Sequence, residues 1–142
     1  MSGPDAALEA LQTTLAAEHA AVFVYGALGA QTSQSATPAL FADVTDAYTT
    51  HQDRRDHLVA TIEDAGGDPV AAEPGYELPA DLSTTAAITG RALRLERAAA
   101  ATYAFLVANT TGRNRAWAVD ALLDTAVREL TFGGAPETLP GL

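Results

Sequence analysis

The sequence predicts an all-α protein of four helices in a single domain, residues 1–142. Three observations support this fold class. Long stretches free of proline repeat apolar or small residues at helical spacing. The prolines and the glycine pairs fall at the ends of these stretches or between them. The chain has 142 residues, of which 48% are hydrophobic, and that is enough for one domain with a substantial core.

Composition excludes several classes of function. The formal net charge is −10 and the sequence pI is about 4.4, which argues against binding to nucleic acid or to an anionic membrane surface. The chain has no cysteine, so disulfide, thiolate and zinc-thiolate chemistry are excluded. We find neither a signal peptide nor an apolar run of membrane-spanning length, and we expect a cytoplasmic protein.

The first helix is expected at residues 4–30. Pro4 suits a first helical turn, and Asp5 complements the helix dipole. The expected inward stripe consists of Leu8, Leu11, Leu15, Val22, Gly26 and Gly29. Glu18 and His19 lie in the middle of this stripe. A carboxylate on a buried face costs several kcal/mol unless it is paired or bound to a metal, so Glu18 needs a partner.

The second helix is expected at residues 38–65. Thr37 can cap it and Pro38 follows in the first turn, whereas Gly66–Gly67 ends it. Its expected inward stripe consists of Leu40, Val44, Ala47, His51, Arg55, Leu58 and Ile62. Two polar residues, His51 and Arg55, therefore again lie at the centre of an apolar stripe.

The segment from Gly66 to Asp81 is the longest non-helical part of the sequence and contains several prolines. Helices that simply turn back need only about 2–8 connecting residues. At about 3.3 Å per residue this segment can span roughly 50 Å, whereas the second helix is about 40 Å long. The third helix can therefore run parallel to the second. One long crossover between the second and third of four helices is the ferritin-like arrangement.

The third and fourth helices are expected at residues 82–109 and 113–132. The inward stripe of the third consists of Ile88, Ala92, Leu95, Glu96, Ala99, Tyr103 and Leu106. The inward stripe of the fourth consists of Ala116, Val119, Leu122, Leu123, Ala126 and Leu130. Trp117 points away from the latter stripe and is expected to pack at a bundle end or to mark a dimer interface.

Glu18, His51 and Glu96 each lie near the midpoint of their own helix. Helices that pack side by side over their full length bring their midpoints to one level. We therefore predict a polar layer of Glu18, His51, Arg55 and Glu96 at the centre of the bundle. Further candidates around this layer are His19, Tyr25, Tyr48 and Tyr103.

A di-iron or di-manganese site in such a bundle takes single Glu ligands from two helices and Glu-x-x-His pairs from the other two. Glu18 and Glu96 suit the single-Glu positions, but the Glu-x-x-His pairs are missing. The residues three positions before the three histidines are Ala16, Tyr48 and Arg54. Arg55 also adds positive charge where a metal needs anionic ligands.

The charges favour a core in which two carboxylates, one arginine and one histidine satisfy one another without a cofactor. The predicted function is accordingly that of a non-catalytic binding or structural bundle. Two alternatives remain open. Glu18, His51 and Glu96 could hold iron or manganese in a metal-binding protein or oxidase, or a cavity beside the layer could bind a small ligand.

Three stretches and the chain end carry a resemblance to a known family. They are EHAAVFVYG at Glu18–Gly26, HQDRRDHL at His51–Leu58, AGGDPVAAEPGYELP at Ala65–Pro79 and LPGL at Leu139–Leu142. The chain resembles the uncharacterised ferritin-like proteins of actinobacteria, a domain of unknown function within the ferritin-like superfamily. The resemblance implies a ferritin-like bundle that forms a homodimer.

The resemblance also bears on individual site residues. It places Glu18 and Glu96 at the single-Glu ligand positions of the superfamily. His51 and Arg55 stand on the helix that normally carries Glu-x-x-His, and they break that pattern.

Overall fold

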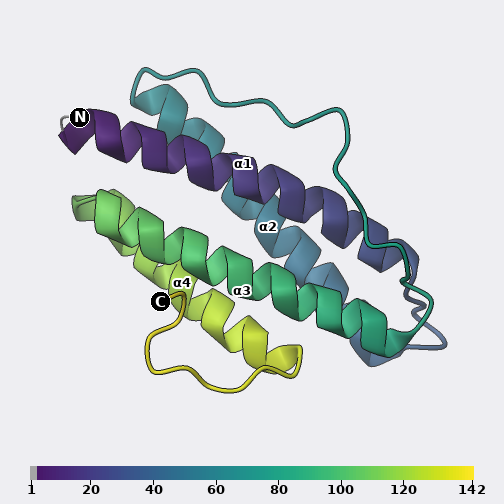
Figure 1. The fold of residues 1–142 in the computed structure, drawn as a ribbon. Helices are drawn as coiled ribbons and strands as arrows, with labels where there is room; N and C mark the ends of the chain where they lie inside the picture. The colour runs from purple at the N-terminus through teal and green to yellow at the C-terminus, as the bar shows by residue number, and fades with distance from the viewer. Residues whose placement is uncertain (1–2) are drawn as a thin grey trace.

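The computed structural model describes residues 3–142, which form four helices and no strand within that range. They are α1 (Gly3–Ala30), α2 (Pro38–Asp64), α3 (Thr85–Asn109) and α4 (Gly112–Thr131), shown in Figure 1. The all-α prediction is confirmed. The helix bounds differ from the expected ones by three residues at most, at the start of α3.

The segment 65–84 runs along the length of the bundle, from the end of α2 to the start of α3 (Figure 1). As a result α2 and α3 run in the same direction, and α1 and α4 run opposite to them. Gln12 on α1 anchors this crossover by binding the backbone of Asp68 and Val70. His19 contributes a further bond, with its Nε2 2.9 Å from the carbonyl oxygen of Val70.

The core has two apolar parts. Helix α1 packs against α2 and α3, and α3 packs against α4. The first part consists of Ala10, Leu11, Leu15, Leu58, Ile62, Tyr103, Leu106, Ala118 and Ala121. The second consists of Val24, Tyr25, Leu28, Val44, Ala47, Ile88, Ala92 and Phe132. The two parts come from opposite halves of the helices, with the polar midpoints between them.

The inward face of α1 differs from the expected stripe in its second half. Tyr25 and Leu28 are buried, whereas Gly26 is exposed. Burial of a large side chain removes far more apolar surface from water than burial of glycine does. The helix therefore turns its larger residues inward after Glu18.

The predicted inward stripe of α4 is wrong. Helix α4 buries Ala118, Ala121, Thr125, Arg128 and Glu129 instead. Val119, Leu123 and Leu130, expected in the core, are exposed. Arg128 bonds to α2, and Arg54 of α2 bonds to α4, so charged side chains hold the inner face of this helix.

Trp117 also joins α4 to α2. Its ring stacks on the ring of His57, with the centroids 4.2 Å apart and an angle of 18° between the planes. It also packs edge-on against Tyr103. Trp117 is thus part of the contact between two helices, with His57 as its partner.

The C-terminal tail, residues 132–142, folds back along the bundle towards the middle of α3 (Figure 1). Gly141 lies against the backbone of Ala100 and Ala101 with a φ of +82°, a close approach that leaves no room for a side chain. In the described part of the chain, no helix combines the length and the apolar character needed to cross a membrane.

Candidate functional site

Three buried ionisable side chains from three helices meet at the centre of the bundle. They are Glu18 on α1, His51 on α2 and Glu96 on α3. The Nδ1 atom of His51 lies 2.5 Å from Oε2 of Glu18, and Nε2 lies 2.8 Å from Oε2 of Glu96. The imidazole ring therefore bridges the two carboxylates, and the three helices are joined at one level.

Two tyrosines complete the hydrogen bonding of this bridge. Tyr103 donates its hydroxyl hydrogen to Oε1 of Glu18 over 2.7 Å. Tyr25 donates to Oε2 of Glu96 over 2.9 Å and stacks its ring on His51. Burial and the neighbouring carboxylates raise the pKa of both hydroxyls above their usual range, so both tyrosines act as neutral donors.

Tyr48, the third tyrosine considered from the sequence, has a different place. It is half-buried and packs against the second apolar part of the core, near Gly26. In the described part of the chain, Tyr48 makes no hydrogen bond to the bridge.

The two carboxylates hold His51 in its charged form. Burial by itself lowers the pKa of this imidazole, but hydrogen bonds and charge interactions with Glu18 and Glu96 outweigh burial and raise the pKa to about 9. At neutral pH both ring nitrogens therefore carry a hydrogen and both donate. The bridge alone is then one cation between two anions.

Arg55 does not belong to this layer, so the prediction that it lies there is wrong. Its side chain is 29% exposed and pairs with Asp56, the next residue. Arg54 is the arginine that turns inward. It donates to Thr125, to the carbonyl oxygen of Ala121 and to Asp124 on α4.

The positions of Arg54 and Arg55 around the axis of α2 explain why only Arg54 turns inward. Arg54 and Arg55 flank His51 on opposite edges of α2, about 60° and 40° from it. Only the edge that carries Arg54 faces hydrogen-bond acceptors on α4. Arg54 also lies over the ring of Tyr103, 5.0 Å from its centroid, and so touches the edge of the bridge.

A second arginine, Arg128 on α4, completes the layer. It was not predicted there from the sequence. It bonds Asp124 on its own helix and Asp46 and Thr50 on α2. Its Nη1 lies 3.9 Å from Oε1 of Glu96, an oxygen with no hydrogen-bond partner among the described residues. The one signal in the sequence for the inward position of Arg128 is its spacing. It follows Ala121 by seven residues and Thr125 by three, so the three residues lie on one face of the helix.

Arg128 is held firmly in its charged form. Burial lowers the pKa of its guanidinium, but the bonds to Asp46 and Asp124 outweigh burial and raise it. At this level the carboxylates of Glu18 and Glu96 lie among three buried cations, His51, Arg54 and Arg128, and the two arginines also pair with Asp46 and Asp124. Each buried charge thus has a partner of opposite sign, as expected for charges that are kept from water.

The donor atoms do not suit a metal ion. A metal needs ligands that converge on one point, about 2.0–2.2 Å from each nitrogen and oxygen. The two nitrogens of His51 point in diverging directions, and each is already bonded to a carboxylate. From residue 3 onward, no group of three histidine or acidic side chains is placed to hold a metal.

A small cavity lies beside the bridge, between α1 and α3. Its volume is about 180 Å³, and Glu18 and His51 form part of its wall. The remaining lining consists of Ala17, Ala20, Ala21, Leu95, Ala98, Ala99 and Thr102. Small side chains thus leave space on one side of the charged residues.

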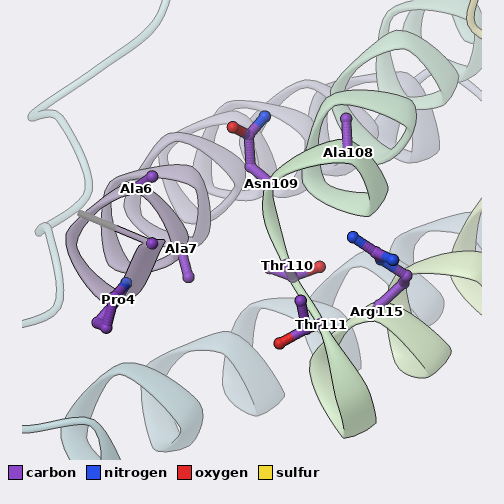
Figure 2. A pocket seen from close by; sticks show the side chains of 9 residues that line it. Pro4, Ala6, Ala7, Ala108, Asn109, Thr110, Thr111 and Arg115 are labelled. Atoms are coloured by element: carbon purple, nitrogen blue, oxygen red, sulfur yellow. The ribbon is translucent and has the colours of Figure 1, made fainter. Parts of the chain in front are cut away.

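A larger pocket of about 460 Å³ lies at the end of the bundle, where α1 begins and α3 turns into α4. Figure 2 shows side chains from α1, from the turn and from α4 around it, with Arg115 on the α4 side. Among the described residues that line it, none is a carboxylate or a histidine. This pocket has no group suited to acid–base or metal chemistry.

Two comparisons with known proteins found a match for this chain. The family described as a domain of unknown function (DUF4439) matches residues 10–142. The crystal structure of a conserved hypothetical protein, rv2844, from Mycobacterium tuberculosis is similar, with a TM-score of 0.84 and 30% sequence identity. The match covers 96% of this chain and 97% of that one. No curated protein matches the chain in sequence.

The charge on His51 predicts a pH-dependent stability. The pKa is about 9 in the folded state and about 6.5 when unfolded, so the stabilisation is complete below about pH 6.5 and is lost as pH rises through 9. We expect a loss of about 3 kcal/mol in the free energy of unfolding between pH 6 and pH 10, measured with urea. His57→Gln should keep this loss and His51→Gln should not. An equal slope in both variants would contradict the assignment.

The two neighbouring arginines form a matched pair. Arg54→Ala should lower the free energy of unfolding by roughly 2–4 kcal/mol, because it removes buried hydrogen bonds from a charged group. Arg55→Ala should change it by less than about 0.5 kcal/mol, because its ion pair with Asp56 is exposed. Urea unfolding of both variants measures the difference. Equal losses would show that the inward position of Arg54 is not what stabilises the bundle.

Proposed function

This chain belongs to the family described as a domain of unknown function (DUF4439), and we propose that it is a ferritin-like bundle in which an ion-pair cluster replaces the metal site. In this proposal the protein is not an enzyme. It works as a binding or structural module whose core is fixed by charge.

The topology supports the ferritin-like assignment. Four-helix bundles with a single long crossover connection are typical of ferritin-like folds. Here the segment 65–84 provides such a connection, and it leaves α2 and α3 parallel (Figure 1). Glu18 and Glu96 then stand on α1 and α3, where a ferritin-like metal site takes its single glutamates.

The position of His51 is the observation that carries the proposal. In a di-metal bundle the metal ions lie between the carboxylates and draw them together. In this chain an imidazolium lies between the carboxylates and bonds both of them, at 2.5 and 2.8 Å. On α4 a cation, Arg128, faces Glu96 where a metal site would need another ligand. Two protein cations thus supply the positive charge that a metal would supply.

The same geometry argues against acid–base catalysis at this layer. Both nitrogens of His51 and both oxygens of Glu18 are engaged within the protein. The remaining oxygen without a hydrogen-bond partner, Oε1 of Glu96, is fully buried and faces Arg128. A general base needs a free position within reach of its substrate. A buried set of opposite charges is instead suited to fixing the register of the helices, because a shift of one helix along its neighbour would separate a buried charge from its partner.

Metal content tests the proposal. Protein purified without chelator from cells supplied with iron, manganese and zinc should contain less than about a tenth of a metal ion per chain. Because metal binding to the native state raises the unfolding temperature, addition of manganese, ferrous iron or a chelator should leave that temperature unchanged within about 1 °C. Elemental analysis and thermal denaturation measure the two quantities.

Glu18→Gln provides the matching variant, and Glu63→Gln, at an exposed position of α2, provides the control. Stoichiometric metal that is lost in Glu18→Gln but kept in Glu63→Gln would overturn the ion-pair assignment. It would favour instead the iron- or manganese-binding alternative with Glu18, His51 and Glu96 as ligands.

The cavity of about 180 Å³ beside the bridge favours a second candidate function, the binding of a small ligand. Its wall is mostly alanine, and the polar atoms of Glu18 and His51 are already bonded to one another. The suitable ligand is therefore small and largely apolar. Dry cavities of comparable size lined by apolar residues bind benzene.

Benzene is thus a fitting probe for this second function. Titration should shift the amide signals of Ala17, Ala21 and Ala99 in NMR spectra, and Ala99→Leu should abolish the shifts by filling the space. Ala60→Leu, at an exposed position of α2, serves as the control. Shifts that persist in Ala99→Leu, or their absence at millimolar benzene, would remove this candidate.

A further inference from the structure

The outer face of α4 carries an apolar stripe that the rest of the described chain leaves open. Val119, Leu123, Val127 and Leu130 are 37%, 59%, 63% and 45% exposed. Scattered exposed apolar residues are normal on a protein surface, but these four follow one another along a single helix face. The face therefore needs an explanation of its own.

The spacing of the stripe is that of a helix–helix contact. We call the set Ala116, Val119, Leu123, Ala126 and Leu130 the α4 seam. Its members alternate steps of three and four residues, the heptad pattern by which one helix packs along another. Because Thr125, Arg128 and Glu129 take the inner face, the seam cannot also be buried in its own bundle.

The charges beside the seam differ between its two ends. Arg113 and Arg115 lie at the start of α4. At the other end the exposed Glu137 of the tail lies beside Glu129, which is buried. Arg115 lies on the α3 side of α4, where its Nε donates to the carbonyl oxygen of Val107. The tail lies on that same side, because it returns to α3 (Figure 1).

We propose that the α4 seam binds the α4 seam of a second copy of this chain in antiparallel orientation, with the two-fold axis near Leu123. Arg115 lies eight residues before Leu123 and Glu129 six residues after it. A two-fold axis there brings Arg115 of each copy level with Glu129 of the other, beside which the exposed Glu137 offers a carboxylate at the surface. The surface is thus complementary to itself, as a two-fold interface requires.

Orientation and size both fit this occupant. A parallel pair would place the arginines of both copies together and the carboxyl groups together, which is unfavourable. A helix of 20 residues is about 30 Å long and about 10 Å wide, and the tail adds a second strip beside it. The face then measures about 600 Å² in projection, or about 1,200 Å² for two copies, the lower end of the range for a stable interface.

This inference does not depend on the role of the buried charges. The seam lies on the opposite face of α4 from Arg128, and a metal in the core would not cover it. Failure of one proposal therefore leaves the other standing.

Sedimentation velocity of the full chain between about 1 and 200 μM tests the interface. We expect a concentration-dependent dimer. Leu123→Glu and Val127→Glu should each raise the dissociation constant about tenfold or more, because they place charge in an apolar contact. Leu78→Glu, a similar change at an exposed leucine of the crossover, should leave it unchanged.

Arg115→Glu should also weaken the dimer, about three- to tenfold, and the added change Glu137→Arg should restore it by reversing the pair. Circular dichroism confirms that each variant is folded. A wild-type chain that stays monomeric over the whole range would overturn the proposal. So would a dimer that survives both Leu123→Glu and Val127→Glu, a dimer weakened equally by Leu78→Glu, or a charge reversal that restores nothing.

Discussion

The bond of one imidazolium to two carboxylates is the interaction on which the rest of the structure depends. His51 joins Glu18 and Glu96, and through them α1, α2 and α3, at the midpoint of the bundle. Tyr25 and Tyr103 each donate a hydrogen bond to one carboxylate of the bridge, and each ring belongs to one of the two apolar parts of the core. Because an unpaired buried charge costs several kcal/mol, the helices have one register in which all three residues are satisfied.

The contact between α2 and α4 is formed by charged and aromatic side chains rather than by the imidazolium bridge. Long side chains connect these helices: Arg54 and Arg128 cross in opposite directions, and His57 stacks on Trp117. An ionic contact of this kind requires α4 to present its polar face to the core. The apolar residues of the same helix are then left on the outside. The internal ion pairs and the exposed α4 seam are therefore two results of a single choice of helix rotation.

The proposed replacement of metal by protein cations has a physical consequence. A metal site is assembled only when the ion is supplied, whereas His51 and Arg128 are always part of the chain. A core held by these two residues needs neither metal nor oxygen to reach its final form. It also keeps its carboxylates away from substrates, and the function of such a protein then lies on its surfaces.

The sequence by itself determined the four helices, the crossover and the residues of the bridge. Helical period, proline and glycine positions and segment length are local properties, and Glu18, His51 and Glu96 share the midpoints of their helices. Only the tertiary structure decided between Arg54 and Arg55, and which face of α4 is buried. These choices depend on what lies across from each helix edge, in particular Thr125 and Asp124 opposite Arg54. For α4 the buried face is the one whose side chains pair with α2, and the aliphatic side chains of its apolar pattern point outward.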